Sequence, residues 1–138
     1  IGLAFAFLGV QLAVFGLYMG IAFAPNHIGM PIVPHGVKLD FLDKQVMTSR
    51  NVSGGWWATA LMGGLNYQIE HHLFPGMPRP HLSRARVLVR EHCRAHGVPY
   101  VENDLASALT IVVRYINDVG WAARHSFSCP AAASMGRG

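Results

Sequence analysis

An unbroken apolar stretch opens the chain and limits the folds that it can adopt. It reads IGLAFAFLGVQLAVFGLYMGIAFA, and no charged side chain occurs before Lys38. As an α-helix this stretch spans roughly 36 Å, enough to cross a hydrocarbon core of ~30 Å with some tilt. A signal peptide is the alternative, but it requires a basic segment at its start, which the stretch lacks. We therefore expect a transmembrane helix over residues 1–25.

The composition supports a membrane protein. Hydrophobic residues make up 51% of the chain and charged residues 13%, against a usual charged share of about 25%. The net charge is +4, and the basic residues follow the apolar stretch, which predicts that Pro25 emerges on the cytoplasmic side. No nucleic-acid-binding motif accompanies the basic residues, so we expect no nucleic acid partner. The chain opens with Ile1 inside the apolar run, which predicts a fragment of a longer protein.

The rest of the chain predicts an all-α fold: a cytosolic or interfacial helical cap over residues 26–123 and a disordered tail over 124–138. Trp56 and Trp57 suit either an interfacial belt or core packing. The expected connectors are residues 48–55 and 98–102. Four helices are expected: residues 38–46 on the membrane surface, 56–73, 83–96 and 105–123. In the third, Val87, Leu88 and Cys93 are expected to be buried and Gly97 to end the helix. Asn103 or Asp104 is expected to cap the fourth.

The stretch Gln68–Pro75 contains the pattern Q-x-x-H-H. In a helix Gln68, His71 and His72 lie on one face, and imidazole is a common ligand of iron, copper and zinc. A satisfied pair of core histidines is the alternative. A zinc protease would need H-E-x-x-H, and structural zinc would need cysteines, neither of which the sequence places suitably.

Other histidines are weaker candidates. His27 directly follows the apolar stretch, so it is either a third ligand or an ordinary histidine at the membrane interface. His92 and His96 stand four residues apart, but without a third ligand they are better interpreted as solvated side chains. His35 falls in a Pro- and Gly-rich loop. The arginines of residues 83–96 form a solvated face or contact phosphate groups.

Three segments resemble the C-terminal part of the membrane-bound fatty acid desaturases: Asn26–Met30, Thr48–Asn51, and Asn66–Pro75 with Pro78-Arg79. The bacterial acyl-CoA or acyl-lipid branch and the front-end desaturases also carry Gln in the last histidine box. The resemblance implies a multi-pass cell-membrane protein of about four helices, the last of which lies in this chain, and a cytosolic cap that holds two irons. It implies O2-dependent insertion of a cis double bond into an acyl chain of acyl-CoA or acyl-lipid. The electrons would come from a ferredoxin-type or cytochrome-type donor.

The resemblance also implies roles for single residues. His27, His71 and His72 would be iron ligands, and Gln68 either a weak ligand or a hydrogen-bond partner of one. Asn66 and Glu70 could orient imidazoles, and the head group or electron donor could contact Arg79, Arg84 and Arg86. The first two histidine boxes of the family are absent from these residues, so this chain alone is expected to be inactive. The alternatives are a related lipid or alkyl hydroxylase and an inactive, membrane-anchored remnant.

Overall fold

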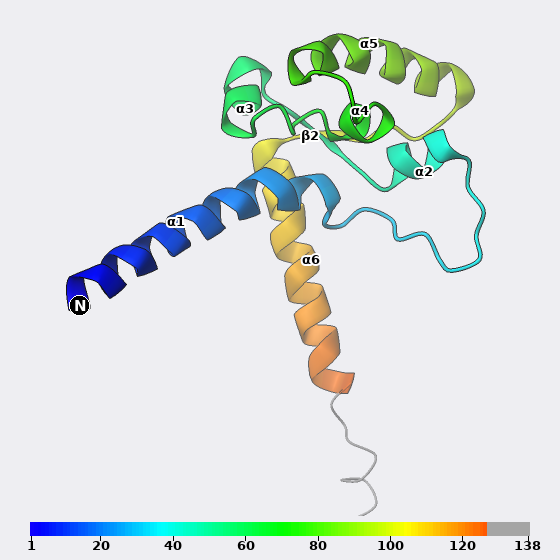
Figure 1. Cartoon of the computed structure of the whole chain (residues 1–138). Coiled ribbons are helices and arrows are strands. Elements are labelled where there is room, and N and C mark those ends of the chain that lie inside the picture. Colours follow the sequence, from blue (N-terminus) through cyan, green and yellow to red (C-terminus); the bar gives the residue numbers. More distant parts are fainter. Residues whose placement is uncertain (127–138) are drawn as a thin grey trace, which may run out of the picture.

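The computed structural model describes residues 1–126, and this part of the chain is mostly helical, as predicted (Figure 1). A cap formed by α2, α3, α4, α5 and a small sheet lies at one end, and two long helices, α1 and α6, project from it. In chain order the elements are α1 (Gly2–His27), α2 (Phe41–Met47), β1 (Asn51–Ser53), α3 (Gly55–Leu61), α4 (Gln68–Leu73), α5 (Arg79–His96), β2 (Glu102–Asp104) and α6 (Leu105–Ser126).

Helix α1 is the one helix within residues 1–126 that is long and apolar enough to cross a membrane. Its only buried side chains are Ala22, Pro25 and Asn26, all near its C-terminal end. The helix continues two residues beyond the expected boundary at Pro25, because the Asn26 amide donates to the carbonyl of Ala22 (3.1 Å) and supports the last turn. It ends before Gly29, which adopts the left-handed conformation (φ 79°) that favours glycine.

Strands β1 and β2 form a parallel pair with Asn51 opposite Glu102. They lie in or next to the two segments that the sequence predicts to be connectors. Each strand is three residues long, and most of its residues are polar types with low strand propensity. Such segments carry no alternating apolar pattern, so the sequence gives no signal for a strand. The pair joins two parts of the chain that are far apart in sequence at the centre of the cap.

Two small apolar clusters hold the cap together. Val46, Ile69, Val89 and Cys93 join α2, α4 and α5. The second cluster consists of Val52 in β1, Met62 after α3 and Ala108 in α6, so it packs α6 beside the sheet. The sheet and α4 are therefore packed from several sides, while most of α1 is uncovered.

The single helix expected over residues 56–73 is wrong: the structure has two helices, α3 and α4, in its place. Gly63 and Gly64 separate them with φ values of 56° and 83°, which a right-handed helix cannot accommodate. The side chain of Arg79 lies against Gly64 and donates to the Gly63 carbonyl (2.6 Å). This break sets the direction of α4 independently of α3.

Helix α5 begins at Arg79, four residues before the expected start, because Pro80 occupies its first turn, where a missing N–H costs nothing. Its buried side chains include Cys93, as predicted, but Val87 and Leu88 are 44% and 68% exposed. Their expected burial was wrong. The buried face instead consists of Leu82, Ala85, Val89 and Cys93. Gly97 ends the helix in the left-handed conformation, as predicted.

Helix α6 starts as expected, with the Asp104 carboxylate accepting the backbone N–H of Ser107 (2.9 Å). It runs to Ser126, so the first three residues of the predicted tail are helical. The other residues of that tail lie outside the described part of the chain.

We predict that Gly64→Ala lowers the free energy of unfolding of the purified protein by about 1–2 kcal/mol, because alanine is strained at a positive φ. A Cβ there would also lie 3.1 Å from the Cβ of Arg79. Thermal unfolding in detergent measures the change. Gly16→Ala in α1 is the control, since its Cβ would meet nothing within 4 Å. Equal stability of the two variants would contradict a strained turn at Gly64.

Candidate metal centre

His27 and His72 meet although 45 residues separate them in sequence. Their rings stack with centroids 5.1 Å apart and planes 21° apart. The ring of His71 lies 6.2 Å from that of His72 and is tilted by 44°. The structure therefore brings the end of α1 and the short helix α4 together at their imidazoles.

Gln68 contacts His72 directly. Its Nε2 lies 2.9 Å from Nε2 of His72, one turn along α4. The Asn26 amide donates to Oε1 of Gln68 (3.4 Å), which leaves the Gln68 NH2 group to donate to His72. On the other side of the ring, His72 Nδ1 lies 3.4 Å from the Ser49 hydroxyl, which donates to the Gln45 carbonyl. This arrangement places the ring proton on Nδ1 and leaves the lone pair of Nε2 as an acceptor.

The surroundings of His72 favour its neutral form. Burial lowers the pKa of His72, and the neighbouring His27 and His71 lower it further. A neutral imidazole is the form that binds a metal ion. The electrostatics of this position therefore suit a ligand.

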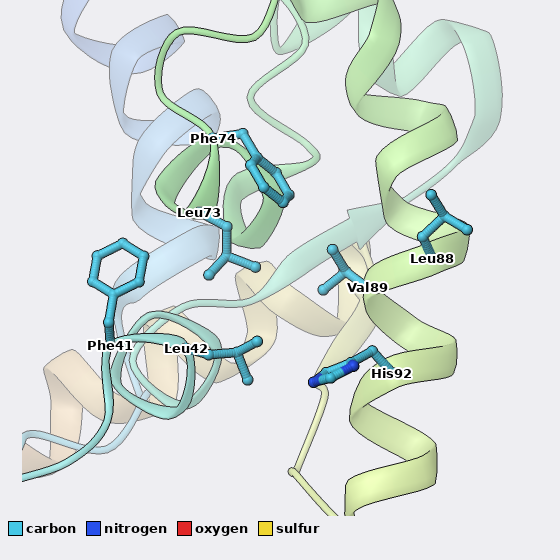
Figure 2. A pocket seen from close by; sticks show the side chains of 7 residues that line it. All are labelled: Phe41, Leu42, Leu73, Phe74, Leu88, Val89 and His92. Atoms are coloured by element: carbon cyan, nitrogen blue, oxygen red, sulfur yellow. The ribbon is translucent and has the colours of Figure 1, made fainter.

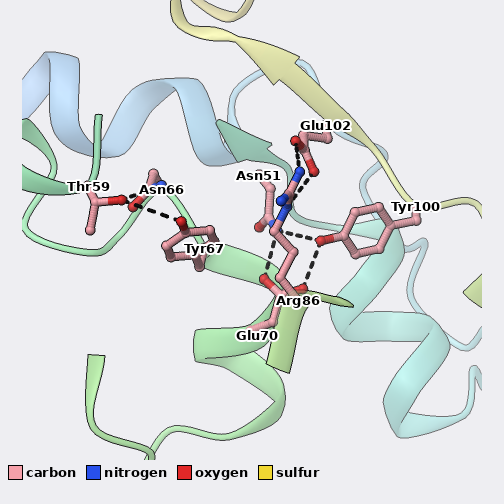
Figure 3. Close-up of polar contacts among 8 residues, drawn as sticks. All are labelled: Asn51, Thr59, Asn66, Tyr67, Glu70, Arg86, Tyr100 and Glu102. Carbon is pink, nitrogen blue, oxygen red and sulfur yellow. Dashed lines mark hydrogen bonds and ion pairs between the residues drawn. The ribbon is translucent and has the colours of Figure 1, made fainter. Parts of the chain in front are cut away.

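Glu70 is fully buried, and its carboxylate lies in a polar network with Asn51 and Tyr100 (Figure 3). Its carboxylate accepts hydrogen bonds from the Asn51 amide (2.7 Å) and from the Tyr100 hydroxyl (2.8 Å). Burial raises the pKa of Glu70, and these two hydrogen bonds oppose that rise. Burial and the adjacent Glu70 also raise the pKa of Tyr100. The partners of Glu70 are thus Asn51 and Tyr100, whereas the resemblance implied that Glu70 could orient an imidazole.

Asn66 is also buried, but it bonds elsewhere. Its side-chain amide donates to the Thr59 hydroxyl (3.2 Å), as Figure 3 shows. Its backbone carbonyl accepts the N–H of Val52 (2.9 Å). Asn66 therefore connects α3, β1 and the turn before α4, and its amide does not reach the imidazoles.

The three arginines predicted to contact a head group or donor lie in different settings. Arg79 caps the Gly63 carbonyl, and Arg86 forms a two-point ion pair with Glu102 of β2 (Figure 3). Arg84 is exposed on α5. Two of the three thus have partners within the cap.

The histidine pair fits part of a metal site. Within residues 1–126 no group of three or more His, Cys, Asp and Glu side chains is arranged to hold a metal ion. His27 and His72 nevertheless lie in ring contact, and two such nitrogen donors suit iron once Nε2 of His72 is released from the Gln68 amide. A complete centre would need further ligands. His92 and His96 stack on each other at 4.1 Å on the exposed side of α5, as expected for solvated side chains.

An apolar pocket of about 450 Å³ lies between α2, α4 and α5 (Figure 2). Phe41 and Leu42 face Leu73, Phe74 and the α5 side chains across it. Leu73, the residue after His72, and His92 are among its lining residues, but His27, His71, His72 and Gln68 are not. It is therefore a separate feature of the cap.

The comparison with protein families decides what kind of protein this is. The family model described as "Fatty acid desaturase" matches residues 1–104, which include α1, β1, α4 and every candidate ligand. The chain belongs to the fatty acid desaturase family.

Curated desaturases from distant organisms are similar to the chain. An acyl-lipid (9-3)-desaturase of Physcomitrium patens is 33% identical over 108 residues, which cover 78% of this chain and 20% of the relative. The Delta(5) fatty acid desaturase fat-4 of Caenorhabditis elegans is 43% identical over 75 residues, covering 54% of this chain and 17% of the relative. Human fatty acid desaturase 3 is 38% identical over 95 residues, which cover 69% of this chain and 21% of the relative. The chain spans about a fifth of the length of these relatives, and no solved structure matches it.

The structure of this desaturase chain also shows residues that sequence reasoning missed. Ser49, Arg50 and Asn51 contact the histidine-bearing elements. They belong to a segment that resembles the family, which was the available signal, although it assigns them no role. Tyr100 carried no signal, because it falls in what looked like a plain linker.

We predict that Arg86 and Glu102 stabilise the cap together. A double-mutant cycle with Arg86→Met and Glu102→Gln should give a coupling free energy of about 1–2 kcal/mol, since the pair is charged, bonded at two points and only partly exposed. Thermal or denaturant unfolding in detergent provides the four values. Arg84→Met is the control and should leave stability unchanged. A coupling near zero would contradict a structural role for Arg86.

Proposed function

We propose that this chain is the C-terminal part of a desaturase that uses O2 to insert a cis double bond into an acyl chain carried by coenzyme A or a lipid. The observation that carries the proposal is the meeting of His27, at the end of the apolar helix, with His72 of the Q-I-E-H-H segment. The family membership supports the same reaction. Because the chain spans a fifth of its relatives, we propose that the complete activity needs the rest of the protein.

His27, His71 and His72 would hold iron, and two irons would supply the O2 chemistry that removes hydrogen from an unactivated methylene. His72 offers Nε2 as the donor atom, and Ser49 keeps its other nitrogen occupied. Gln68 would release Nε2 of His72 when iron binds there, because its amide donates to that same atom in the structure, and it would then serve as a weak ligand or as a hydrogen-bond partner of another ligand. His71 would turn toward ligands contributed by the earlier histidine boxes of the family.

We propose that α1 spans the membrane and that the cap lies on its cytoplasmic side. The side chains along α1 are exposed and apolar, as lipid contact requires, whereas its last turn is buried against the cap. Trp56 is 83% exposed, which suits an interfacial position rather than core packing. An acyl chain could thus reach the histidines from the lipid while its head group stays in water. Arg84 is the remaining free candidate among the predicted arginines for contact with that head group or with an electron donor of the ferredoxin or cytochrome type.

The test is expression of the full-length gene and analysis of the fatty acids by gas chromatography. A new cis double bond is the expected product, whereas a hydroxylated acyl chain would show the alternative reaction of related histidine-box enzymes. No new product and no bound iron would indicate the inactive remnant.

We predict that His72→Ala and His71→Ala in the full-length protein abolish the product and lower the iron content, and that His27→Ala has the same effect. His96→Ala is the matched control, because that ring stacks on His92 away from the centre. Iron is measured by mass spectrometry of the purified protein. Full activity in a His71 or His72 variant would disprove its assignment as a ligand.

We also predict that Gln68→His retains part of the activity, because imidazole occupies this position in many members of the family. Product formation and iron content are measured on the same preparation. A complete loss of activity with unchanged iron would show that the amide itself is required, through its bonds to His72 and Asn26.

A further inference from the structure

The segment Ser49–Val52 lies between the two elements that carry the candidate histidines, and its members bond to one or the other. Ser49 contacts the ring of His72 (3.4 Å). Arg50 bonds to the end of α1, and Asn51 bonds to α4. The backbone N–H of Val52 donates to Asn66, just before α4. One extended segment is thus in contact with both histidine-bearing helices.

Arg50 fixes the end of α1. Its guanidinium donates to the carbonyls of Pro25 (3.0 Å) and Ile28 (3.4 Å), and its backbone N–H donates to the carbonyl of Asn26 (2.9 Å). These carbonyls lie at a helix C-terminus, where they lack helical partners and carry partial negative charge. Arg50 is 2% exposed, so its side chain has little freedom to move. His27 lies between the residues that Arg50 holds.

Asn51 fixes the first turn of α4. Its Oδ1 accepts the backbone N–H of Ile69 (2.9 Å), while its Nδ2 donates to Glu70 (2.7 Å) and to the Tyr100 hydroxyl (2.6 Å). A flipped amide would place its oxygen against the Glu70 carboxylate, so only one orientation is compatible with these partners. The turn that carries His71 and His72 is therefore held through both its backbone and its buried carboxylate.

We infer that Arg50 and Asn51 are a pair of positioning residues that set the spacing between His27 and His72 for metal binding. Side chains of successive residues in an extended segment point to opposite sides, which explains why one reaches α1 and the next reaches α4. Because the two are adjacent in the backbone, neither helix can shift without the other or without breaking these bonds. The inference rests on the proposed function for the metal, and it adds two residues to which that function assigns no role.

The experiment uses the purified full-length protein, stripped of metal, with Arg50→Met, Asn51→Ala, the double variant and His72→Ala. Fe(II) is titrated into each protein, and hydrogen exchange is followed over residues 26–30 and 68–74. Ser107→Ala is the control, because it removes one side-chain hydrogen bond, to Asp104 at the far end of the strand pair, and none near the histidines.

Each single variant should bind Fe(II) roughly ten- to hundredfold more weakly, yet reach the wild-type stoichiometry at saturating Fe(II), because every ligand is still present. His72→Ala should not regain it. The double variant should be little weaker than the weaker single variant, since the spacing is lost in either. Exchange should rise over residues 26–30 in Arg50→Met and over 68–74 in Asn51→Ala, while Ser107→Ala stays at the wild-type level.

Wild-type Fe(II) affinity in both single variants, or additive losses in the double variant, would overturn the inference. If Asn51→Ala fails to fold, Tyr100→Phe takes its place: it removes one hydrogen bond to Glu70 and should weaken Fe(II) binding in the same direction but by less. An unchanged Fe(II) affinity in Tyr100→Phe would equally overturn the inference. Wild-type binding in His72→Ala would instead refute the proposed function. Unchanged exchange in both single variants would refute the positioning role by itself.

Discussion

The buried carboxylate of Glu70 is the constraint on which much of the cap depends. A carboxylate with no exposed surface is costly to bury unless donors compensate it. Here the donors are Asn51 and Tyr100, which lie 49 residues apart in sequence. Satisfying one side chain therefore brings α4 against β1 and against the segment that leads into β2. Asn51 also pairs with Glu102 across the sheet, and Glu102 forms the ion pair with Arg86.

The position of the histidines follows from the same network. Glu70 and the histidines share a six-residue helix, which is too short to be stable alone and depends on its tertiary contacts. The buried side of that helix bonds to Asn51 and Tyr100, while its other side presents Gln68 and His72 to the end of α1. Separate faces of one short helix thus serve packing and chemistry. The break at Gly63 and Gly64 allows this helix to take its own direction.

Much of this could be predicted from the sequence where the signal is local. The apolar run of α1, the Asp104 cap of α6 and the Gly97 end of α5 depend on neighbouring residues, and the structure has all three. The strands could not be predicted, because their polar residues are held by side chains distant in sequence. The burial of Val89 rather than Val87 and Leu88 was missed because it depends on which face of α5 packs against α2 and α4, and that is set by contacts distant in sequence. For the site, the spacing of Q-x-x-H-H placed Gln68 beside His72, but the partner of Glu70 and the role of Arg50 depend on tertiary contacts.

His27 and His72 are proposed to be ligands of one metal site. The position of iron in the full-length protein, from an anomalous difference map recorded at the iron absorption edge, tests this most directly. If both residues bind iron, a peak is expected within coordination distance of both imidazoles, with Nε2 of His72 released from the Gln68 amide. A peak elsewhere, with the hydrogen bond between Gln68 and His72 intact, would contradict it.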